Sequence, residues 1–565
     1  MACSLGGCTD LRRKFENIEV ALPFLIFSAL VIIPLLLALD RLIYVSGQMP
    51  WQVFSSLDEH YLSQGAIGFT FVQALLSTAL TLTIGIPIAW QLGRYHWPKI
   101  RLMRALLTLP FVTPAIVAAM GFMAILGSDG FDLRGDSSTY LASLLFAHAW
   151  FNIALVIRFV DPVISNLDPR MEEQLRLLPA GNSRWGRLRW FWMPLMFPSI
   201  LCAAVLTFVF SFTSFAMVRW MTPSNATLET VMADVGGAAG ITNYQIYANE
   251  LVLASSTIQF LVLIMALWLL SVLQAKRIRT IAEVSESHSR KQGRMGWVVL
   301  IPALVFCLSP LIAVMRASLR VAERGPVISH RWTLDGWKSA ISGDYAYISI
   351  IDGLQNSLGY AALTLVIALP LGWSLSSGIH LLEKRGSRWA KPLDTLTMLP
   401  LAISGVMLGL GILLGIIRIS TVFFTMWWMP AVPHIMLATP FVVRLLLPAM
   451  RRQDPELIEN AQVLALSRWQ ILTKIRIPLL RGPLIVAGII AIAMSMGEFG
   501  ASWILVRTGA WDTLPVLVDQ LMTRPGFDPL VKPTAMAAAS LLMFTTLVLF
   551  LLAERFRPDG DGGMF

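Results

Sequence analysis

Charged residues are scarce in this chain. Only 14% of its 565 residues are Asp, Glu, Lys or Arg, whereas 56% are hydrophobic. Soluble domains need about 25% charged residues to cover their surface. The composition therefore excludes a water-soluble globule and predicts an all-α polytopic protein whose solvent is the lipid bilayer.

Cysteine is also rare, and no nucleotide-binding signature is present. Cys3, Cys8, Cys202 and Cys307 show no metal-ligand spacing, and two of them lie inside apolar runs, where cysteine behaves as a small hydrophobic residue. The sequence therefore predicts neither a disulfide framework nor a metal site. Because no G-x-x-x-x-G-K-[ST] phosphate loop or catalytic residue set is visible, we expect a protein that is not an enzyme and binds no cofactor itself.

The net charge of +10 does not indicate a nucleic-acid partner. Lys and Arg fall in short clusters between apolar runs, where the positive-inside bias of membrane proteins places them. The first twenty residues, MACSLGGCTDLRRKFENIEV, are polar and basic. They resemble a cytoplasmic tail more than a cleavable signal peptide.

Twelve apolar segments are long enough to cross a bilayer. A spanning helix needs about 20 apolar residues, because it rises about 1.5 Å per residue through a core of about 30 Å. The segments lie near 20–40, 66–92, 103–126, 139–160, 195–218, 249–274, 296–315, 356–379, 395–417, 425–449, 480–505 and 533–553. Proline and glycine inside them, as in Leu-Pro-Phe-Val-Thr-Pro at 109–114, predict kinks that keep this count.

The distribution of basic loops predicts the orientation. Four basic connections fall on one side of the membrane, which we assign to the cytoplasm: 94–104, 170–189, 276–294 and 384–391. The opposite connection 316–338 also carries several basic residues, so most loops, but not all, agree. With an even number of spans, both termini are expected in the cytoplasm and the chain in the inner (plasma) membrane.

The second half of the chain repeats the first. The match is closest where AHAWFNIALVIRFVDP (147–162) meets PHIMLATPFVVRLLLP (433–448), which pairs His148 with His434. LTLTIGIPIAW (80–90) likewise pairs with LTLVIALPLGW (363–373). Six spans separate corresponding segments, so the two halves share one membrane orientation and form a parallel repeat of two fused six-helix units.

The repeat divides the chain into domains. The predicted boundaries are 1–65 (tail, first span and loop), 66–275 (first transmembrane domain), 276–295 (cytoplasmic linker), 296–352 (seventh span and loop), 353–555 (second transmembrane domain) and 556–565 (tail).

A long cytoplasmic connection follows the fourth span of each half. In the second half it reads DPELIENAQVLALSRWQILTKIRIPLL (454–480), which is much longer than a helix-to-helix turn requires. Its apolar spacing predicts a short amphipathic helix, a turn and a second helix.

This second loop resembles the cytoplasmic signature of the permease subunits of binding-protein-dependent ATP-binding-cassette (ABC) importers. That signature is E-A-A, three residues, G, nine residues and I-x-L-P. The same spacing is found here, and the matching residues are Glu459, Asn460, Ala461, Ala465, Ile475 and Pro478. The departures are Asn460 for the second motif residue, Ala465 for glycine and Ile477 for leucine. Alanine tolerates a positive φ poorly, which bears on the turn at Ala465.

The first half carries a looser copy, MEEQLRLLPAGNSRWGRLRWFWMPLM. Glu173 fits the acidic position, Gly181 the glycine and Pro194 the final proline. Because this copy is two residues longer, Glu173 and Gly181 cannot both hold the family register.

The resemblance implies a function and a set of partners. It implies a permease that forms a translocation pathway for a small solute and works with a dimer of ATP-binding cassette subunits, which use the ATP, and with an extracytoplasmic solute-binding protein. The two loops would couple the motor to the permease. Permeases for thiamine and for ferric iron in this family are commonly one polypeptide with two such halves. The cargo stays open between thiamine, ferric iron, a phosphonate or another solute.

Four polar residues in the spans are candidates for the substrate pathway. Glu498 is costly at membrane depth, and it could attract a cationic solute or could hydrogen-bond a neighbouring helix. Ser214 occupies the matching place in the first half. His148 and His434 could belong to the pathway or could make structural hydrogen bonds between helices.

Two other classes of function stay open. A secondary transporter driven by an ion gradient also commonly has twelve spans and two parallel halves, but it should lack paired coupling loops and work without a motor protein. A membrane enzyme or assembly scaffold would need clustered acids or histidines at one membrane face, and the sequence shows none.

Overall fold

The computed structural model describes most of the chain. The described residues are 5–60, 63–127, 130–133, 135–166, 169–177, 183–238, 246–281, 290–291, 294–323, 329–416, 419–506, 509 and 511–556.

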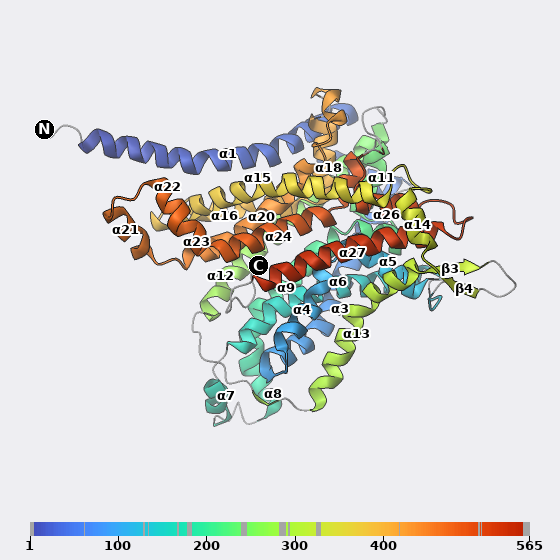
Figure 1. Cartoon of the computed structure of the whole chain (residues 1–565), viewed down its shortest axis with the longest axis horizontal. Coiled ribbons are helices and arrows are strands. Elements are labelled where there is room, and N and C mark those ends of the chain that lie inside the picture. The colour runs from blue at the N-terminus through green and yellow to red at the C-terminus, as the bar shows by residue number, and fades with distance from the viewer. Residues whose placement is uncertain are drawn as a thin grey trace. The chain divides into compact units, whose positions relative to one another are not determined.

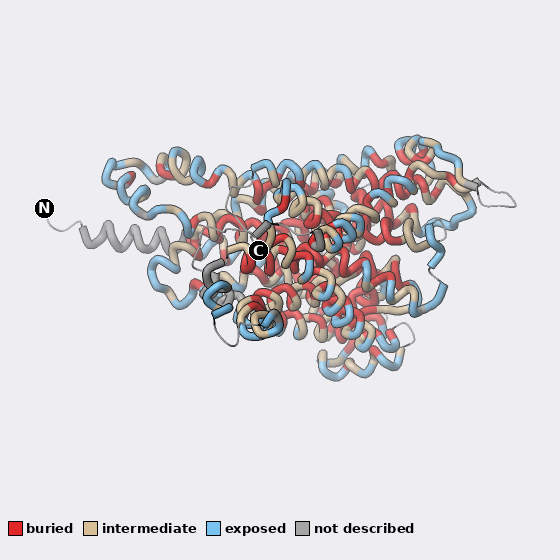
Figure 2. The backbone as a smooth tube through the Cα atoms, turned by 90° about the horizontal axis from the view of Figure 1, so that it is seen from below, coloured by how far each residue is buried: buried red, intermediate tan, exposed pale blue. Residues whose placement is uncertain are grey.

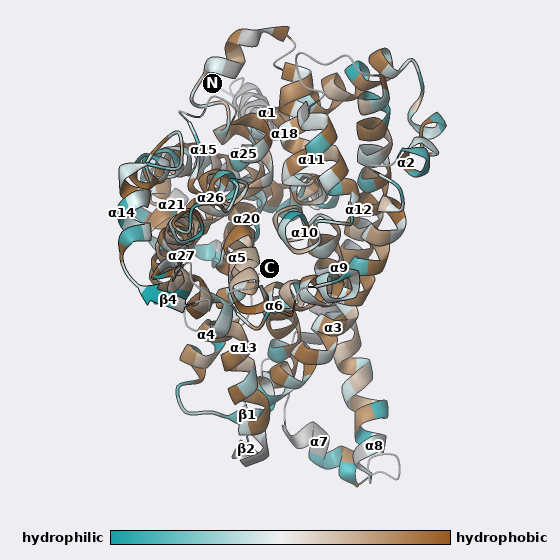
Figure 3. Cartoon of the chain, turned by 90° about the vertical axis from the view of Figure 1, so that its right-hand side faces the viewer, coloured by the Kyte–Doolittle hydropathy of each residue, from teal (hydrophilic) through white to brown (hydrophobic). Residues whose placement is uncertain are grey.

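The protein is an all-α polytopic membrane protein (Figure 1). Within the described residues the only strands are two short pairs: β1 (Tyr95–His96) with β2 (Arg290–Lys291), and β3 (Arg320–Glu323) with β4 (Ser329–Trp332). Apolar helices satisfy their own backbone hydrogen bonds, which is why this architecture suits lipid. Figure 3 shows apolar ribbon along much of α12 (Ile246–Ile281) and polar ribbon at α14 (Asp335–Ser342).

Nine described helices are long and apolar enough to cross a membrane, and three bent helix pairs raise the number to twelve if each pair is one span. All twelve overlap the predicted segments. The kink predicted near 109–114 is present. The helix direction changes by 98° after Val112 and by 90° after Leu401.

These sharp bends recur at equivalent places in the repeat. α4 (Ile100–Val112) contains Pro110 in its last turn and is followed by α5 (Ala115–Leu126), and α17 (Leu399–Ala402) likewise ends just after Pro400. Extended backbone at Thr113 and Ile403 ends the two helices. The structure therefore repeats the interruption as well as the spans.

The described chain forms two compact units. Unit 1 comprises residues up to 41, 355–505 and those after 547. Its elements are most of α1 (Leu5–Ser46), most of α15 (Ile350–Lys384), α16 (Ala390–Thr397), α17 (Leu399–Ala402), α18 (Gly405–Gly411), η4 (Ile412–Ile416), η5 (Thr421–Thr425), α20 (Ala431–Arg451), α21 (Pro455–Val463), α22 (Arg468–Ile471), η6 (Leu472–Arg476), α23 (Ile477–Leu479), α24 (Arg481–Gly497) and α25 (Gly500–Leu505).

Unit 2 comprises residues 42–354 and 506–547. Besides α4, α5, α12, α14 and the four strands, its elements are η1 (Pro50–Gln52), α2 (Ser56–Glu59), α3 (Ala66–Arg94), α6 (Ser137–Ser165), α7 (Pro169–Arg176), α8 (Arg184–Arg187), η3 (Leu188–Trp192), α9 (Met193–Phe212), α10 (Ala216–Met221), α11 (Leu228–Ala238), α13 (Arg294–Ser318), α26 (Leu514–Met522) and most of α27 (Val531–Arg555).

The first helix of each half packs with the other half. In unit 1, α1 lies against the second half, and a Cβ added at Gly415 would stand 2.6 Å from the Pro34 carbonyl oxygen of α1. In unit 2, α13 lies against the first half, and a Cβ at Gly121 would stand 2.7 Å from the Pro310 carbonyl oxygen. Small residues allow such close backbone approach between membrane helices. The predicted domain boundaries follow the sequence repeat and stay a prediction, because the compact units divide the chain differently.

Each unit has its own apolar core. In unit 1 it centres on α20 and α24, with Val442, Leu446 and Ala487 fully buried. In unit 2 it joins α4, α6 and α13 through residues such as Leu107, Ile153 and Leu300. Figure 2 shows buried segments along the middle of the long helices and exposed ones at helix ends and loops.

Candidate functional site

The second loop (454–480) folds into the predicted helix, turn and helix. α21 begins after Asp454, whose carboxylate accepts a hydrogen bond from the Glu456 backbone N–H at 3.0 Å. α22 begins at a reciprocal cap. The Gln470 N–H donates to the Ser467 hydroxyl at 3.2 Å, and the Ser467 N–H donates to the Gln470 side chain at 2.9 Å. Both helix starts are thus fixed by local side chains.

Ala465 makes the turn between the two helices. Its φ is +57°, in the left-handed region that favours glycine. The Leu466 N–H donates to the Ala461 carbonyl oxygen at 3.1 Å, the long bond of a Schellman C-cap. Glycine is the usual residue at this position of the cap, so the geometry explains why the family motif places glycine there. Alanine tolerates a positive φ poorly, as noted from the sequence, yet Ala465 takes the left-handed conformation here.

The second loop presents apolar side chains at its surface. Val463 is 84% exposed, Leu464 75% and Trp469 71%. Figure 1 shows α21 and α22 beyond the ends of α15 and α24. An exposed apolar group of this kind on a short capped helix pair is a candidate docking surface.

The motif residues of the second loop differ in their exposure. Glu459 and Asn460 lie exposed on α21, whereas Ala461 is buried. Ile475 is half-buried in η6, and Pro478 is exposed in α23. The acidic end of the motif is therefore accessible to a partner.

The first loop (169–195) shows the same order of elements. Glu173 lies exposed on α7, and Pro194 lies exposed at the start of α9. Gly181 lies outside the described residues. The Gly186 N–H donates to the Ser183 hydroxyl at 2.8 Å, so Ser183 begins α8 as Ser467 begins α22. From these serines to the motif prolines the two loops have equal length, which places Gly181 at the distance of Ala465 and the extra residues before it.

A π-helical turn precedes the motif proline in both loops, and the sequence interpretation missed it. The Met193 N–H donates to the Leu188 carbonyl, and the Ile477 N–H donates to the Leu472 carbonyl, five residues back in each case. π-helical turns are rare in proteins, and those that occur are often found at functional sites. The ungapped match of Ser-Arg-Trp through Pro-Leu in both loops was the sequence signal that could have indicated it.

The two loops differ after the π turn. In the first half the helix runs on from Trp185 to Phe212, whereas in the second half the segment Trp469–Leu479 is bent by 76° from α24. Pro483 lies in the first turn of α24, and because it has no N–H it cannot donate a helical hydrogen bond back across the bend. The second loop is therefore set apart from its following helix by a sharp bend, whereas the first loop continues directly into its own.

Glu498 lies at the break between α24 and α25. One carboxylate oxygen accepts from the Ala501 N–H at 2.8 Å, and the other accepts from the Ser502 N–H at 3.0 Å and from the Ser502 hydroxyl at 3.1 Å. The side chain is 8% exposed. Glu498 therefore acts as an N-terminal cap that satisfies backbone donors left free by the broken helix.

The two histidines contact serines of neighbouring helices. His434 Nδ1 lies 2.8 Å from the Ser495 hydroxyl, and its Nε2 lies 2.8 Å from the Ser502 hydroxyl and 3.4 Å from Glu498. His148 Nδ1 lies 3.0 Å from the Ser77 hydroxyl of α3. The structure thus brings His434 and Glu498 into one network in unit 1, and it places His148 in a separate contact in unit 2.

Ser214 occupies the corresponding break in unit 2, between α9 and α10, and is half-buried. α10 and α25 begin at equivalent positions of the repeat. Among the described residues, no three His, Cys, Asp or Glu side chains are grouped so that they could hold a metal ion.

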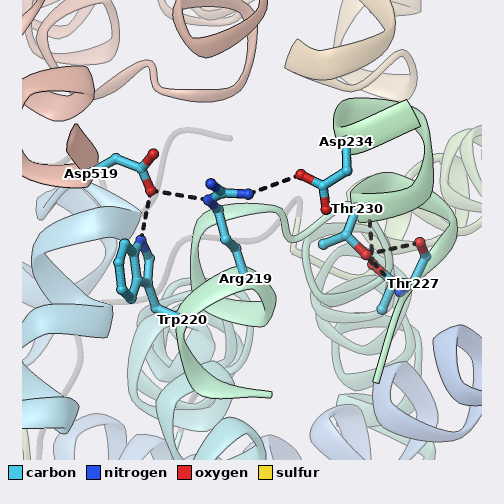
Figure 4. Close-up of polar contacts among 6 residues, drawn as sticks. All are labelled: Arg219, Trp220, Thr227, Thr230, Asp234 and Asp519. Carbon is cyan, nitrogen blue, oxygen red and sulfur yellow. Dashed lines mark hydrogen bonds and ion pairs between the residues drawn. The ribbon is translucent and has the colours of Figure 1, made fainter. Parts of the chain in front are cut away.

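An ion-pair cluster in unit 2 was not expected from the sequence. Arg219 of α10 donates through Nε to Asp519 of α26 at 3.0 Å and through Nη1 to Asp234 of α11 at 2.9 Å (Figure 4). The Trp220 indole N–H also donates to Asp519, at 2.9 Å. The cluster therefore joins α10 and α11 of the first half to α26 of the second half. Three hundred residues separate Arg219 from Asp519, so no local pattern indicated the contact.

Comparison with known proteins agrees with this geometry. Residues 368–559 match the family described as binding-protein-dependent transport system inner membrane component. This range contains the second loop and the break between α24 and α25 at which Glu498 lies.

Curated relatives extend the match along the chain. The thiamine transport system permease protein ThiP of Haemophilus influenzae is 25% identical over 550 residues, which is 93% of this chain and 94% of that protein. The sulfate transport system permease protein CysT of Escherichia coli is 29% identical over 33% of this chain and 68% of its own length. A probable sulfate transport system permease protein of Marchantia polymorpha is also 29% identical, and the match spans 59% of that protein. Repeated bends, paired loops and similarity over 93% of the chain agree: residues 368–559 match the binding-protein-dependent transport family, and nearly the whole chain resembles a permease subunit with two fused halves.

Proposed function

We propose that this chain forms the translocation pathway of an ATP-driven importer for a small solute. In this proposal a dimer of ATP-binding cassette subunits binds the two loops and uses the ATP, and an extracytoplasmic solute-binding protein delivers the cargo. The chain itself binds no cofactor. The observation that carries the proposal is the capped helix pair of the second loop, with Val463, Leu464 and Trp469 at its surface.

The proposed mechanism is alternating access driven through the loops. ATP binding closes the motor dimer, the two loops move with it, and the pathway opens outward to accept cargo. Hydrolysis resets the pathway inward. The π turns next to Pro194 and Pro478 link each loop to the helix that follows, so movement of a loop is passed to α9 or α24.

Trp469 offers a sharp test of the docking surface. Trp469→Ala should reduce co-purification of the ATPase subunit at least about tenfold, because truncation of a central interface tryptophan commonly costs about 2 kcal/mol or more. Trp51→Ala is the matched control, since Trp51 is 68% exposed but lies in η1, outside both loops. Equal retention of the ATPase by both variants would count against the assignment.

Glu459 tests the coupling itself. We expect Glu459→Ala to reduce ATP-dependent uptake at equal expression, because this exposed acid stands on the helix that faces the motor in the proposal. Unchanged uptake would contradict a coupling role for this loop.

For the cargo, we propose thiamine. The support is that a thiamine permease matches nearly the whole chain, whereas the sulfate permeases match about a third of it. Ferric iron is the alternative that the sequence raised. Uptake of labelled thiamine and of ferric ion by cells that contain or lack the chain separates the two, and chain-dependent iron uptake without thiamine uptake would overturn the thiamine assignment.

Glu498, Ser214, His148 and His434 are proposed to border the pathway. Glu498 and Ser214 stand at equivalent helix breaks, between α24 and α25 and between α9 and α10, where backbone leaves the helical path and can line a cavity. We also propose that both termini lie in the cytoplasm of a cell whose inner membrane holds the chain, as the basic loops indicate.

A further inference from the structure

A cavity of about 580 Å³ lies in unit 2, at the C-terminal end of α13. Its lining residues belong to the ends of α5, α13 and α26, the start of α27 and the β3–β4 hairpin. These elements are labelled in Figure 1. The volume falls within the range of small-molecule sites, about 300–1,000 Å³. None of the residues predicted from the sequence lines it.

The polar part of the cavity is basic. The side chains with positive or ionisable nitrogen are Arg316, Arg320, His330, Arg524 and Lys532. Asp528 is the one carboxylate among the described lining residues, and it already accepts hydrogen bonds from the Tyr345 hydroxyl and the Leu530 N–H. His330 Nε2 is buried without a hydrogen-bond partner among the described residues. A concave site with this excess of positive charge attracts an anion.

The rest of the cavity wall is apolar. Met123, Phe131, Leu521 and Val531 contribute to it. Just before Arg316, α13 exposes Ile312 and Met315, which are 64% and 48% exposed, as expected of a helix surface that faces lipid chains. The basic cavity therefore lies at the end of an apolar helix surface, and a ligand with an anionic head and an apolar tail matches both parts.

We propose that this cavity binds the phosphate headgroup of an anionic phospholipid, whose acyl chains lie along α13. Arginine suits this role, because its planar guanidinium can donate two parallel hydrogen bonds to phosphate oxygens. Inorganic phosphate offers the same anionic chemistry, but it would not use the exposed surface of Ile312 and Met315.

The test uses the purified full-length chain, stripped of lipid in detergent and titrated under native mass spectrometry. The probes are phosphatidylglycerol, phosphatidylethanolamine with the same acyl chains, and inorganic phosphate. Phosphatidylglycerol should bind in preference to the zwitterionic lipid. The double variant Arg316→Gln/Arg524→Gln should weaken its binding about tenfold or more, because each arginine–phosphate contact is charge-assisted.

Lys338→Gln is the matched control, since Lys338 is an exposed cation of α14 in the same unit but outside the cavity. It should leave lipid binding unchanged. If the double variant does not fold, Arg524→Gln alone replaces it, because Arg524 is exposed in the connection after α26. Equal binding of the two lipids, or equal loss in the Lys338 control, would overturn the proposal. Binding of inorganic phosphate without preference for the anionic lipid would identify a free-anion site instead and would likewise overturn it.

Discussion

Ala465 holds an unfavourable backbone conformation in the turn of the second loop. An L-residue in the left-handed region costs about 1–2 kcal/mol relative to the usual helical conformation, and glycine avoids this cost. We expect Ala465→Gly to stabilise the turn and Ala465→Val to destabilise it, because a β-branched residue tolerates positive φ less well. Hydrogen exchange of the amides of α21 and α22 measures both effects.

One observation would contradict the prediction for Ala465. If Ala465→Gly speeds amide exchange in α21 and α22, the Schellman cap does not hold the two helices together. Ser404→Gly is the control, because Ser404 is the hydroxyl cap of α18, elsewhere in unit 1. This substitution should leave the exchange of the second loop unchanged.

We expect substitution of Glu498 to lower the stability of the folded chain. Glu498→Ala would leave the Ala501 and Ser502 N–H groups without their acceptor in a buried place, which costs about 1–3 kcal/mol. We therefore expect a lower unfolding temperature of the purified chain. Glu498→Gln keeps one acceptor oxygen and should lose less.

Uptake kinetics of the same variants separate the two roles of Glu498. If the residue only caps α25, Glu498→Gln should reduce the maximal uptake in proportion to the folded protein and leave the half-saturating cargo concentration unchanged. A large rise in that concentration with normal stability would show that the carboxylate contacts cargo.

At the scale of elements, the contact between α5 and α13 depends on Gly121. A Cβ there would stand 2.7 Å from the Pro310 carbonyl oxygen, so Gly121→Ala must push two backbones apart. We expect a loss of about 1–3 kcal/mol, as for other overpacked sites. The unfolding temperature of the purified chain checks this.

Gly359 provides the matched control for Gly121. It lies within α15, and no atom comes within 4 Å of its added Cβ. Gly359→Ala should be neutral or stabilise the helix by up to about 1 kcal/mol. Equal destabilisation by both substitutions would contradict the proposed close approach.

The elements differ in how far the sequence predicts them. The spans follow from the length of apolar runs, and the second loop follows from its helical spacing and motif, so both were predictable. The packing of α1 and α13 against the opposite half was not predictable, because hydropathy identifies a spanning helix but not its neighbours. The contact of Arg219 with Asp519 and the cap made by Glu498 also depend on tertiary placement, which residue spacing within one segment does not encode.

At the scale of the whole molecule, each half depends on the other, because α1 and α13 each pack with the opposite half. α1 completes unit 1, whereas most of the first half lies in unit 2. We expect fragments 1–281 and 290–565 to be degraded when expressed singly and to co-purify when expressed together. A stable, monodisperse fragment 1–281 on its own would contradict this dependence.

We propose above all that a separate ATPase drives transport through this chain. The most direct measurement is solute uptake into proteoliposomes that contain the chain with or without its ATPase subunit and binding protein. We predict uptake only when both partners and ATP are present, and its loss with Trp469→Ala. Uptake driven by an ion gradient in vesicles that hold the chain alone would contradict this claim.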